Sequence, residues 1–281
     1  MPNYGYHLAR AKARAVRAVY TAFLSSIAQR HISEGAKVPF SVFSYSGESA
    51  LPEQVASIRS FLKYVGRPKK FTVVSDGTLS ARSIAILKSL DCWIDSSARW
   101  LPRGLPTKTY SYLTTHPTGK QLALIMSLPV DGPTLYVDSD VLFFPGARNL
   151  AQFIEGVGAP ACYLPDCRLS ADDRLFRGPA EKADPVNTGV LVLFEKLDWT
   201  LAIHRLLDLP GPPDFFTNQT MTHLTMHANG ALPLDNRRYV LQLDDQFVYG
   251  DHYASNDLVL RHYVNPVRHK FWTTIARRNR R

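Results

Sequence analysis

Short apolar runs alternate with segments of helical periodicity along most of the chain. Runs typical of buried strands occupy residues 40–45, 71–74, 92–94, 134–144 and 161–164. Segments with one apolar helical face occupy residues 52–64, 80–90, 120–127 and 149–155. Strands separated by helices of this length form βαβ units. The pattern therefore predicts an α/β fold with a mixed, mostly parallel sheet flanked by helices.

The run from Thr134 to Phe144 is the most apolar and contains Asp138-Ser139-Asp140 at its centre. Ligands bind at the carboxyl ends of strands in open α/β sheets. In an extended chain, Asp138 and Asp140 share one face because strand side chains alternate. Two carboxylates on one face suit Mg²⁺ or Mn²⁺ with room for substrate phosphates. The alternative is a pair of surface acids in a β-turn.

The second half of the chain is less regular. Residues 165–185 are polar and rich in Pro and Gly, which is typical of a long loop near a site. Asn187-Thr188-Gly189 then opens a second fully apolar strand that ends at Phe194. Later helices are predicted over 198–207 and 217–227, and late strands over 239–243 and 258–264. Without repeats or a clear linker, residues 38–276 are predicted to form a single domain.

Basic residues dominate both ends of the chain, whose formal net charge is +9. Residues 7–30 are predicted as one amphipathic helix within an N-terminal segment, 1–37, in which Glu34 is the first acid. Residues 277–281 are predicted as a basic tail. Such charge suits nucleic acid, an anionic membrane or a phosphorylated substrate. The helix can lie on an anionic membrane or pack on the domain with a solvated basic face.

Cysteine content and hydropathy bear on the location of the protein. Cys92, Cys162 and Cys167 match no disulfide or zinc framework, so we expect all three to be packing residues in a reducing compartment. No window reaches the roughly 18 apolar residues of a membrane span, and no secretory signal is evident. We therefore expect a cytoplasmic protein, with peripheral attachment to the inner face of the membrane as an alternative.

Three segments, in this order, resemble the GT-A glycosyltransferases. They are Tyr136 to Phe143 with its Asp-x-Asp, Asn187 to Leu193 with its Asn-x-Gly, and His262 to Arg268. The resemblance is to family 8, the glycogenin and lipopolysaccharide galactosyltransferase group, and extends from Phe40 to Trp272. It implies a GT-A fold and a hexosyltransferase that uses a nucleotide-diphosphate sugar, with a UDP-sugar as the expected donor. It also implies a glycan or lipid-linked acceptor and retention of the anomeric configuration.

The resemblance assigns metal and donor ligands by position. In family 8, the two acids and the His of a C-terminal His-x-x-Gly-x-x-Lys-Pro-Trp motif hold Mn²⁺ against the donor diphosphate. This implies Asp138, Asp140 and His262 as metal ligands, with Ser139 beside the donor. The Lys of the motif falls on Arg268, while Asn265 and His269-Lys270 depart from the Gly and Pro-Trp positions. Either Arg268 or Lys270 is therefore expected to contact the diphosphate.

Two further donor-binding residues follow from the resemblance. The basic residue that family 8 has upstream of the Asp-x-Asp, near the donor sugar, falls on Lys120. Asp76 ends the second predicted strand, where uracil or ribose recognition is expected, although a turn residue is an equal alternative.

Glycosyl transfer has an oxocarbenium-like transition state that nearby carbonyl or carboxylate oxygens stabilise. Asp166, Asn187 and Gln219 are the catalytic candidates. Their structural alternatives are a loop turn, a strand cap and a surface helix position. The Asp-Gln pair of the family has two matches here, Asn218-Gln219 and Asp245-Gln246.

Other classes of protein remain alternatives. A haloacid dehalogenase-type phosphatase also uses a strand with Asp-x-Asp, and Leu243-Asp244-Asp245 imitates its late acidic pair. However, that motif normally opens its domain, and here about a hundred residues come before Asp138. A basic protein that binds nucleic acid or an anionic surface is a second alternative. No basic run interleaved with aromatic residues supports it, so no nucleic-acid partner is expected. A glycosyltransferase fold without activity is a third.

Overall fold

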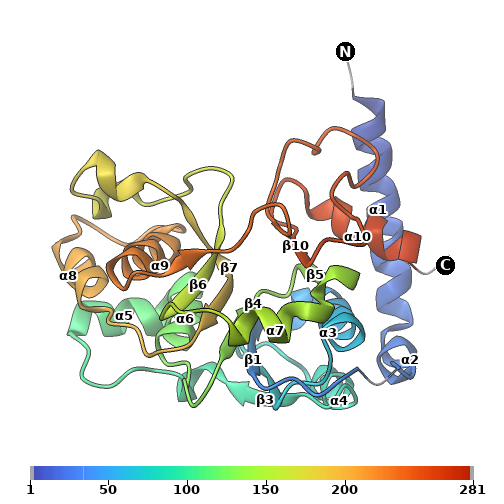
Figure 1. Cartoon of the computed structure of the whole chain (residues 1–281), viewed down its shortest axis with the longest axis horizontal. Coiled ribbons are helices and arrows are strands. Elements are labelled where there is room, and N and C mark those ends of the chain that lie inside the picture. Colours follow the sequence, from blue (N-terminus) through green and yellow to red (C-terminus); the bar gives the residue numbers. More distant parts are fainter. Residues whose placement is uncertain (1–2, 34, 279–281) are drawn as a thin grey trace.

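The fold is built on a seven-stranded sheet with helices on both faces (Figure 1). The structure is a computed structural model that describes residues 3–33 and 35–278. The strand order is β3-β2-β1-β4-β7-β6-β8. The bounds are β1 Ser41–Ser46, β2 Lys70–Ser75, β3 Trp93–Ser96, β4 Thr134–Val137, β6 Ala161–Pro165, β7 Val186–Leu193 and β8 Leu232–Pro233.

Strand directions confirm the predicted mixed, mostly parallel sheet. β1 is parallel to β2 and β4, β2 is parallel to β3, and β6 is parallel to β8. β7 alone runs antiparallel to its two neighbours, β4 and β6. The carboxyl ends of β1, β2 and β4 therefore lie at one edge of the sheet.

Both faces of the central strands β4 and β7 are buried, which explains their continuous apolar runs. In β4, Leu135 and Val137 face a core shared with α3 and α10, whereas Tyr136 faces a core shared with α6 and α9. The helices that build these layers are α3 Leu51–Tyr64, α4 Ala81–Lys88, α5 Thr107–Thr115, α6 Pro117–Met126, α7 Leu150–Glu155, α8 Thr200–Asp208, α9 Thr217–Ala228 and α10 Arg268–Arg278.

A second sheet of three short strands joins the C-terminal part of the chain to the centre. It consists of β5 Val141–Phe143, β10 Leu260–His262 and β9 Tyr239–Val240. β10 pairs antiparallel to β5, with His262 opposite Val141. The backbone N–H of Tyr263 also donates to the carbonyl of Asp140 at 3.0 Å. This pairing brings a residue from the end of the chain beside the Asp-x-Asp.

The N-terminal segment forms two helices, α1 Tyr4–Ala22 and α2 Leu24–Gln29, and α1 crosses α10 (Figure 1). The prediction of one helix over 7–30 is wrong, because the helix is interrupted at Phe23. Tyr20 packs edge-on against Trp272, with 5.2 Å between ring centroids. Within residues 3–33 and 35–278, no helix has the length and apolar character that crossing a membrane requires.

The C-terminal segment differs from the predicted basic tail over residues 277–281. Arg277 and Arg278 belong to the last turn of α10, and residues 279–281 lie outside the described residues. Arg278 donates to the carbonyl of Phe143 at 2.8 Å and lies over the Phe144 ring. Part of the terminal charge thus anchors α10 to β5.

Three further features differ from what the sequence predicted. α5 was not predicted because its Thr- and Tyr-rich sequence has weak helix propensity, which the burial of Tyr112 and Leu113 overrides. The late strands are shorter than predicted, with two residues in β9 and three in β10. Cys92 and Cys162 are buried, as packing residues should be, but Cys167 is exposed in the loop that follows β6.

Candidate functional site

Asp138-Ser139-Asp140 forms a turn between β4 and β5, at the carboxyl edge of the main sheet. The N–H of Val141 donates to the carbonyl of Asp138 at 3.3 Å across this turn. The extended chain that we expected here is therefore wrong, and so is its alternation argument. The two carboxylates nevertheless converge, because the turn directs both of them toward β10.

His262 completes a group of three potential metal ligands. Its Nε2 lies 3.0 Å from Oδ1 of Asp140 and 3.7 Å from Oδ2 of Asp138. One ligand atom from each residue lies within 4.8 Å of the other two. His262 and Asp140 are buried, and Asp138 is partly exposed. Protein therefore encloses the group on the side of His262 and Asp140, and an ion could reach it from solvent at Asp138.

Asn187 fixes the tautomer of His262. Its Oδ1 accepts from the N–H of Gly189 at 2.9 Å and lies 2.9 Å from Nδ1 of His262. The Asn187 amide nitrogen donates to Oδ2 of Asp166 at 3.1 Å, so the orientation of the amide is determined. Nδ1 of His262 must then carry the proton that Oδ1 accepts. The hydrogen bond from Nδ1 to Asn187 holds the ring with Nε2 toward the two aspartates.

Gly189 provides the space for the His262 ring. A Cβ at Gly189 would come within 2.8 Å of Nε2 and closer still to Cε1 and Nδ1. The N–H of Asp138 donates to the Gly189 carbonyl at 2.8 Å, so β7 passes directly beside the turn. The Asn-x-Gly segment thus has a physical reason in this fold: Asn187 orients the imidazole and Gly189 leaves room for it.

Arg268, and not Lys270, lies at the aspartates. Arg268 Nη2 lies 2.5 Å from Oδ2 of Asp140, and its side chain is half-exposed. Lys270 is buried, and its ammonium donates to the carbonyls of Val248 and Gly250. The expectation that Lys270 contacts a diphosphate is therefore corrected, since helix geometry turns it into the protein interior.

Two donors hold Asp138 on the side away from His262. Tyr136 Oη donates to Oδ1 of Asp138 at 2.8 Å, and Gln121 Nε2 donates to the same oxygen at 2.9 Å. Asn218 in turn donates to Oε1 of Gln121 at 3.1 Å. Oδ2 of Asp138 is left facing His262. No pattern in the sequence pointed to Gln121, apart from its place beside Lys120 on the same helix.

The charges of this group shift the pKa values of its members. Burial and the neighbouring charge of Asp140 raise the pKa of Asp138, against the opposing effect of His262. The pKa of Asp140 is lowered, because His262 and Arg268 outweigh the effect of its burial. The pKa of His262 is raised by Asp140 and Asp138 despite burial. His262 and Arg268 therefore favour the ionised form of Asp140, whereas burial and the charge of Asp140 oppose a full charge on Asp138.

The three residues fit a divalent cation. Two carboxylate oxygens and a His nitrogen oriented through Nδ1 are ligands that Mn²⁺ and Mg²⁺ accept, the nitrogen favouring Mn²⁺. Burial and the negative charge of Asp140 raise the pKa of Asp138, and a cation between the three residues would offset both effects. Ser139 lies between the two aspartates in the turn and is partly exposed.

The three catalytic candidates form one hydrogen-bonded cluster. Oδ2 of Asp166 accepts from Asn187 and from Gln219, both at 3.1 Å. Gln219 also donates to the carbonyl of Ser170 at 3.0 Å, which ties the start of α9 to the 165–185 loop. Through Asn187 the cluster continues to His262 and the aspartates. Of the two Asp-Gln matches, Asn218-Gln219 is the one that reaches this network.

Asp76 and Lys120 lie on two separate elements. Asp76 follows β2 and accepts from the backbone and hydroxyl of Thr78 at 2.8 and 2.6 Å, as a turn residue does. Together with burial, its charge raises the pKa of Tyr45 on β1 to about 12. It therefore lies at the same edge of the sheet as the aspartates. Lys120 is half-buried on α6, where its neighbour Gln121 makes the contact with Asp138.

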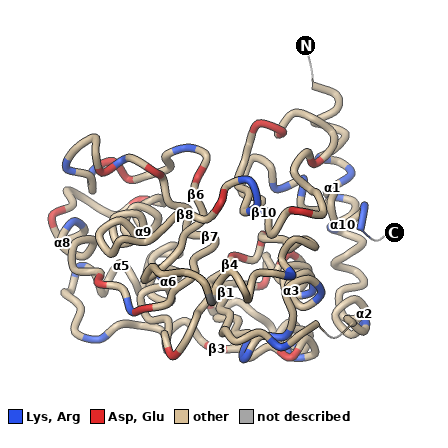
Figure 2. The backbone as a smooth tube through the Cα atoms, viewed as in Figure 1, with Lys and Arg blue, Asp and Glu red and all other residues tan. Residues whose placement is uncertain are grey.

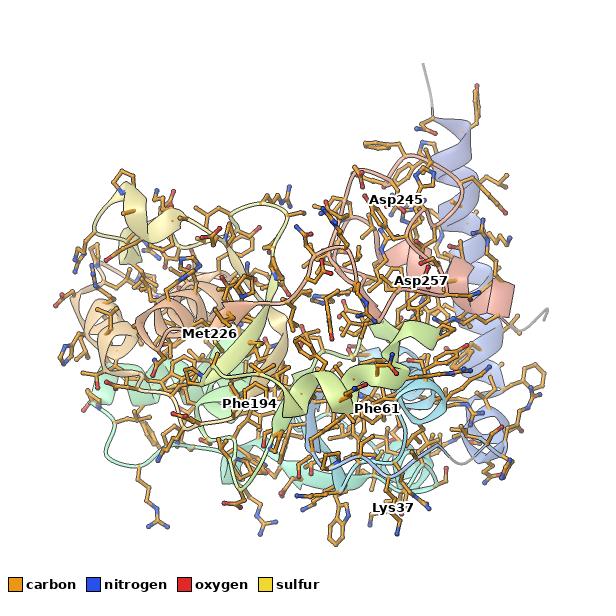
Figure 3. The ribbon with its side chains drawn as sticks, viewed as in Figure 1. Lys37, Phe61, Phe194, Met226, Asp245 and Asp257 are labelled. Atoms are coloured by element: carbon orange, nitrogen blue, oxygen red, sulfur yellow. The ribbon has the colours of Figure 1, made fainter. Side chains whose placement is uncertain are left out.

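Asp244 and Asp245, which imitate the late acidic pair of a phosphatase, have structural partners in this fold. Asp245, labelled in Figure 3, pairs with the buried guanidinium of Arg261 at 2.7 Å. Asp244 accepts from Tyr253 Oη at 2.7 Å. Arg261 also pairs with Asp251. These acids hold the loop before β10 together, so they do not act as the partners of Asp138 that a phosphatase requires.

Comparison with known proteins gives matches at the level of structure. No family profile and no curated protein sequence matches this chain. The galactosyltransferase LgtC, in complex with donor and acceptor sugar analogues, matches with a TM-score of 0.52 and 14% identity over 85% of this chain and 95% of LgtC. Mouse xyloside xylosyltransferase 1 matches with a TM-score of 0.51 and 10% identity over 83% of this chain and 99% of that chain.

A third match has the same fold in a larger protein. The bifunctional glycosyltransferase WbbM matches with a TM-score of 0.53 and 12% identity, over 84% of this chain and 47% of WbbM. Identities this low establish the fold alone, and the narrower likeness to family 8 stays a proposal. The chain described here has the GT-A glycosyltransferase fold.

Proposed function

We propose that this protein is a metal-dependent glycosyltransferase of the family 8 type that takes a hexose from a nucleotide-diphosphate sugar. The observation that supports the proposal is the convergence of Asp138 and Asp140, from one turn, with His262, from a distant strand, at the carboxyl edge of the sheet. Surface acids in an ordinary turn would not have a buried imidazole oriented by its own amide partner. Arg268 adds a cation at the same point.

The residues present match the needs of the reaction. When the bond between the sugar and the diphosphate breaks, negative charge develops on the leaving oxygen. Asp138, Asp140 and His262 would hold Mn²⁺, or Mg²⁺, which supplies Lewis-acid stabilisation of that charge. Arg268 would bind the same diphosphate through its guanidinium, which can present two parallel donors to phosphate oxygens. The ion pair with Asp140 keeps this group in position before the donor binds.

Asp166, Asn187 and Gln219 are proposed to face the sugar. Their mutual hydrogen bonds fix the Asp166 carboxylate, which could stabilise an oxocarbenium-like anomeric carbon. Gln219 could present its side-chain carbonyl oxygen to the same centre. The family likeness favours retention of configuration, which proton NMR of the first-formed product would test.

UDP is the proposed nucleotide, and a glycan or a lipid-linked sugar is the proposed acceptor. Asp76 lies at the end of β2, where it could accept from the uracil or ribose. A Cβ at Gly47 would overlap the Asp76 carboxylate, so the two turns at this edge pack closely. Lys120 and Ser139 are proposed to contact the donor sugar and diphosphate.

The direct test is release of nucleoside diphosphate from a panel of UDP-, GDP- and ADP-sugars in the presence of Mn²⁺. We expect slow hydrolysis of one donor, dependent on metal and lost in Asp138→Asn. Release of phosphate from a generic monoester, without any requirement for a nucleotide sugar, would contradict the proposal.

A further inference from the structure

A cleft of about 420 Å³ lies between α1 and the start of α10, beside the candidate metal site. Its floor is apolar and includes Ala13, Pro266 and Trp272. Four arginines line it: Arg10, Arg14, Arg17 and Arg268. Figure 2 shows the basic positions along α1 and α10. A volume of this size accommodates a small ligand.

The arginines of α1 form a row along one side of the helix. Arg10, Arg14 and Arg17 follow one another at spacings of four and three residues, so their side chains lie on one face. Like charges at these spacings destabilise a helix that has no counter-charge. Glu53 is the one acid among the described residues that line the cleft. An anionic ligand therefore accounts for this row of arginines better than a role in stabilising the fold does.

Glu53 is already engaged. It accepts from Arg17 through both carboxylate oxygens, at 2.6 and 3.0 Å, and from the indole N–H of Trp272 at 3.0 Å. Its charge is matched by Arg17 alone. Within the described part of the chain, Arg10 and Arg14 have no acidic partner, and both are exposed.

The cleft holds these charges in place. Arg10 donates to Tyr6 Oη at 3.2 Å and lies over the Tyr6 ring. Tyr6 packs edge-on against His269, with 5.4 Å between ring centroids. Burial, followed by the positive charges of Lys270 and Arg10, lowers the pKa of His269 in the cleft. The first turn of α10 also lines it and adds the positive end of its dipole.

Arg268 connects the two sites. It lines the cleft and also pairs with Asp140, whereas the described residues that line the cleft do not include Asp138, Asp140 or His262. A second anionic group could therefore bind on the far side of Arg268 from a diphosphate held at the aspartates.

We propose that the cleft between α1 and α10 binds a phosphate group, and that this group belongs to the acceptor of the transfer. The assignment to the acceptor rests on the proposed function, while the phosphate site itself does not. The acceptor class is thus a phosphate or diphosphate ester, whose apolar part would lie on Ala13, Pro266 and Trp272.

The test is calorimetric titration of the full chain with pyrophosphate in EDTA, so that metal plays no part. We expect pyrophosphate to bind and its binding to weaken as the salt concentration rises. In Arg10→Gln/Arg14→Gln the dissociation constant should rise about tenfold or more, because each arginine contributes a charge-assisted hydrogen bond. The matched control is Arg82→Gln/Arg103→Gln, which removes the same charge from exposed positions outside the cleft and should leave the dissociation constant unchanged. Unchanged binding in Arg10→Gln/Arg14→Gln, or an equal loss in the control, would overturn the phosphate site.

A second titration separates acceptor from donor. With UDP and Mn²⁺ at saturation, pyrophosphate should still bind, and Asp138→Asn should not change its dissociation constant. Displacement of pyrophosphate by UDP and Mn²⁺ would overturn the acceptor assignment. If UDP and Mn²⁺ do not bind at all, the proposed function fails, whereas the EDTA titration still decides the phosphate site.

Discussion

Gly189→Ala offers a direct test of how His262 is positioned. The new Cβ would come within 2.8 Å of Nε2 and closer to two other ring atoms. The ring is buried and held at both nitrogens, by Asn187 and Asp140, so it cannot rotate away without breaking those contacts. Overpacking of this kind costs about 1–3 kcal/mol of unfolding free energy.

The same substitution should be harmless once the ring is removed. Gly189 lies within β7, whose extended backbone suits alanine. Without the clash, replacing glycine in a strand is neutral or stabilises by roughly 0.5 kcal/mol through loss of freedom in the unfolded chain. We therefore expect Gly189→Ala to destabilise the wild type but not a His262→Ala background. The coupling energy from the four urea-unfolding free energies should be about 1–3 kcal/mol.

Metal binding should also weaken in Gly189→Ala. Displacement of an oriented imidazole costs about 10–100-fold in metal affinity, so Mn²⁺ binding should weaken by that factor in Gly189→Ala. Gly158→Ala is the control, because a Cβ there meets nothing within 4 Å. An equal loss of stability for Gly189→Ala in both backgrounds would refute the reasoning, since the cost would then not come from His262.

Three further predictions concern charged and exposed positions. Arg268→Gln should weaken binding of UDP with Mn²⁺ about tenfold with little change in melting temperature, because the side chain is half-exposed; unchanged affinity would remove it from the donor site. Lys270→Met should cost about 1–3 kcal/mol of unfolding free energy, because two buried carbonyls lose their donor. UDP affinity should stay the same, and weaker UDP binding in the folded variant would show that Lys270 belongs to the donor site. Leu8 and Val19, 61% and 60% exposed on α1, should contact an anionic membrane. Leu8→Ser/Val19→Ser should then reduce co-sedimentation with vesicles that contain phosphatidylglycerol, and equal sedimentation of both proteins would count against that contact.

The features that the sequence predicted are those set by local pattern. The strands that lead to Asp138 have apolar runs because both sheet faces are covered, and their alternation with helices is visible without coordinates. The resemblance to family 8, which rests on the order of Asp138, Asn187 and His262 along the chain, also suggested one site.

Other features depend on tertiary contacts that no local pattern contains. The turn at Ser139 directs both aspartates toward β10, although the apolar run suggested a continuous strand. Lys270 was expected at the diphosphate, because sequence does not reveal which side of α10 faces inward. Gln121 became visible only through its hydrogen bond to Asp138. The packing of α1 on α10, which aligns its arginines with Arg268, is likewise a property of the folded chain.

Calorimetric titration of UDP with and without Mn²⁺, in the wild type and in Asp138→Asn, tests the central claim most directly. We expect UDP to bind the wild type only with the metal, and Asp138→Asn to weaken this binding at least about tenfold, because the metal site loses a ligand. Binding of UDP with equal affinity in EDTA, or with unchanged affinity in Asp138→Asn, would contradict a metal-diphosphate site at these aspartates.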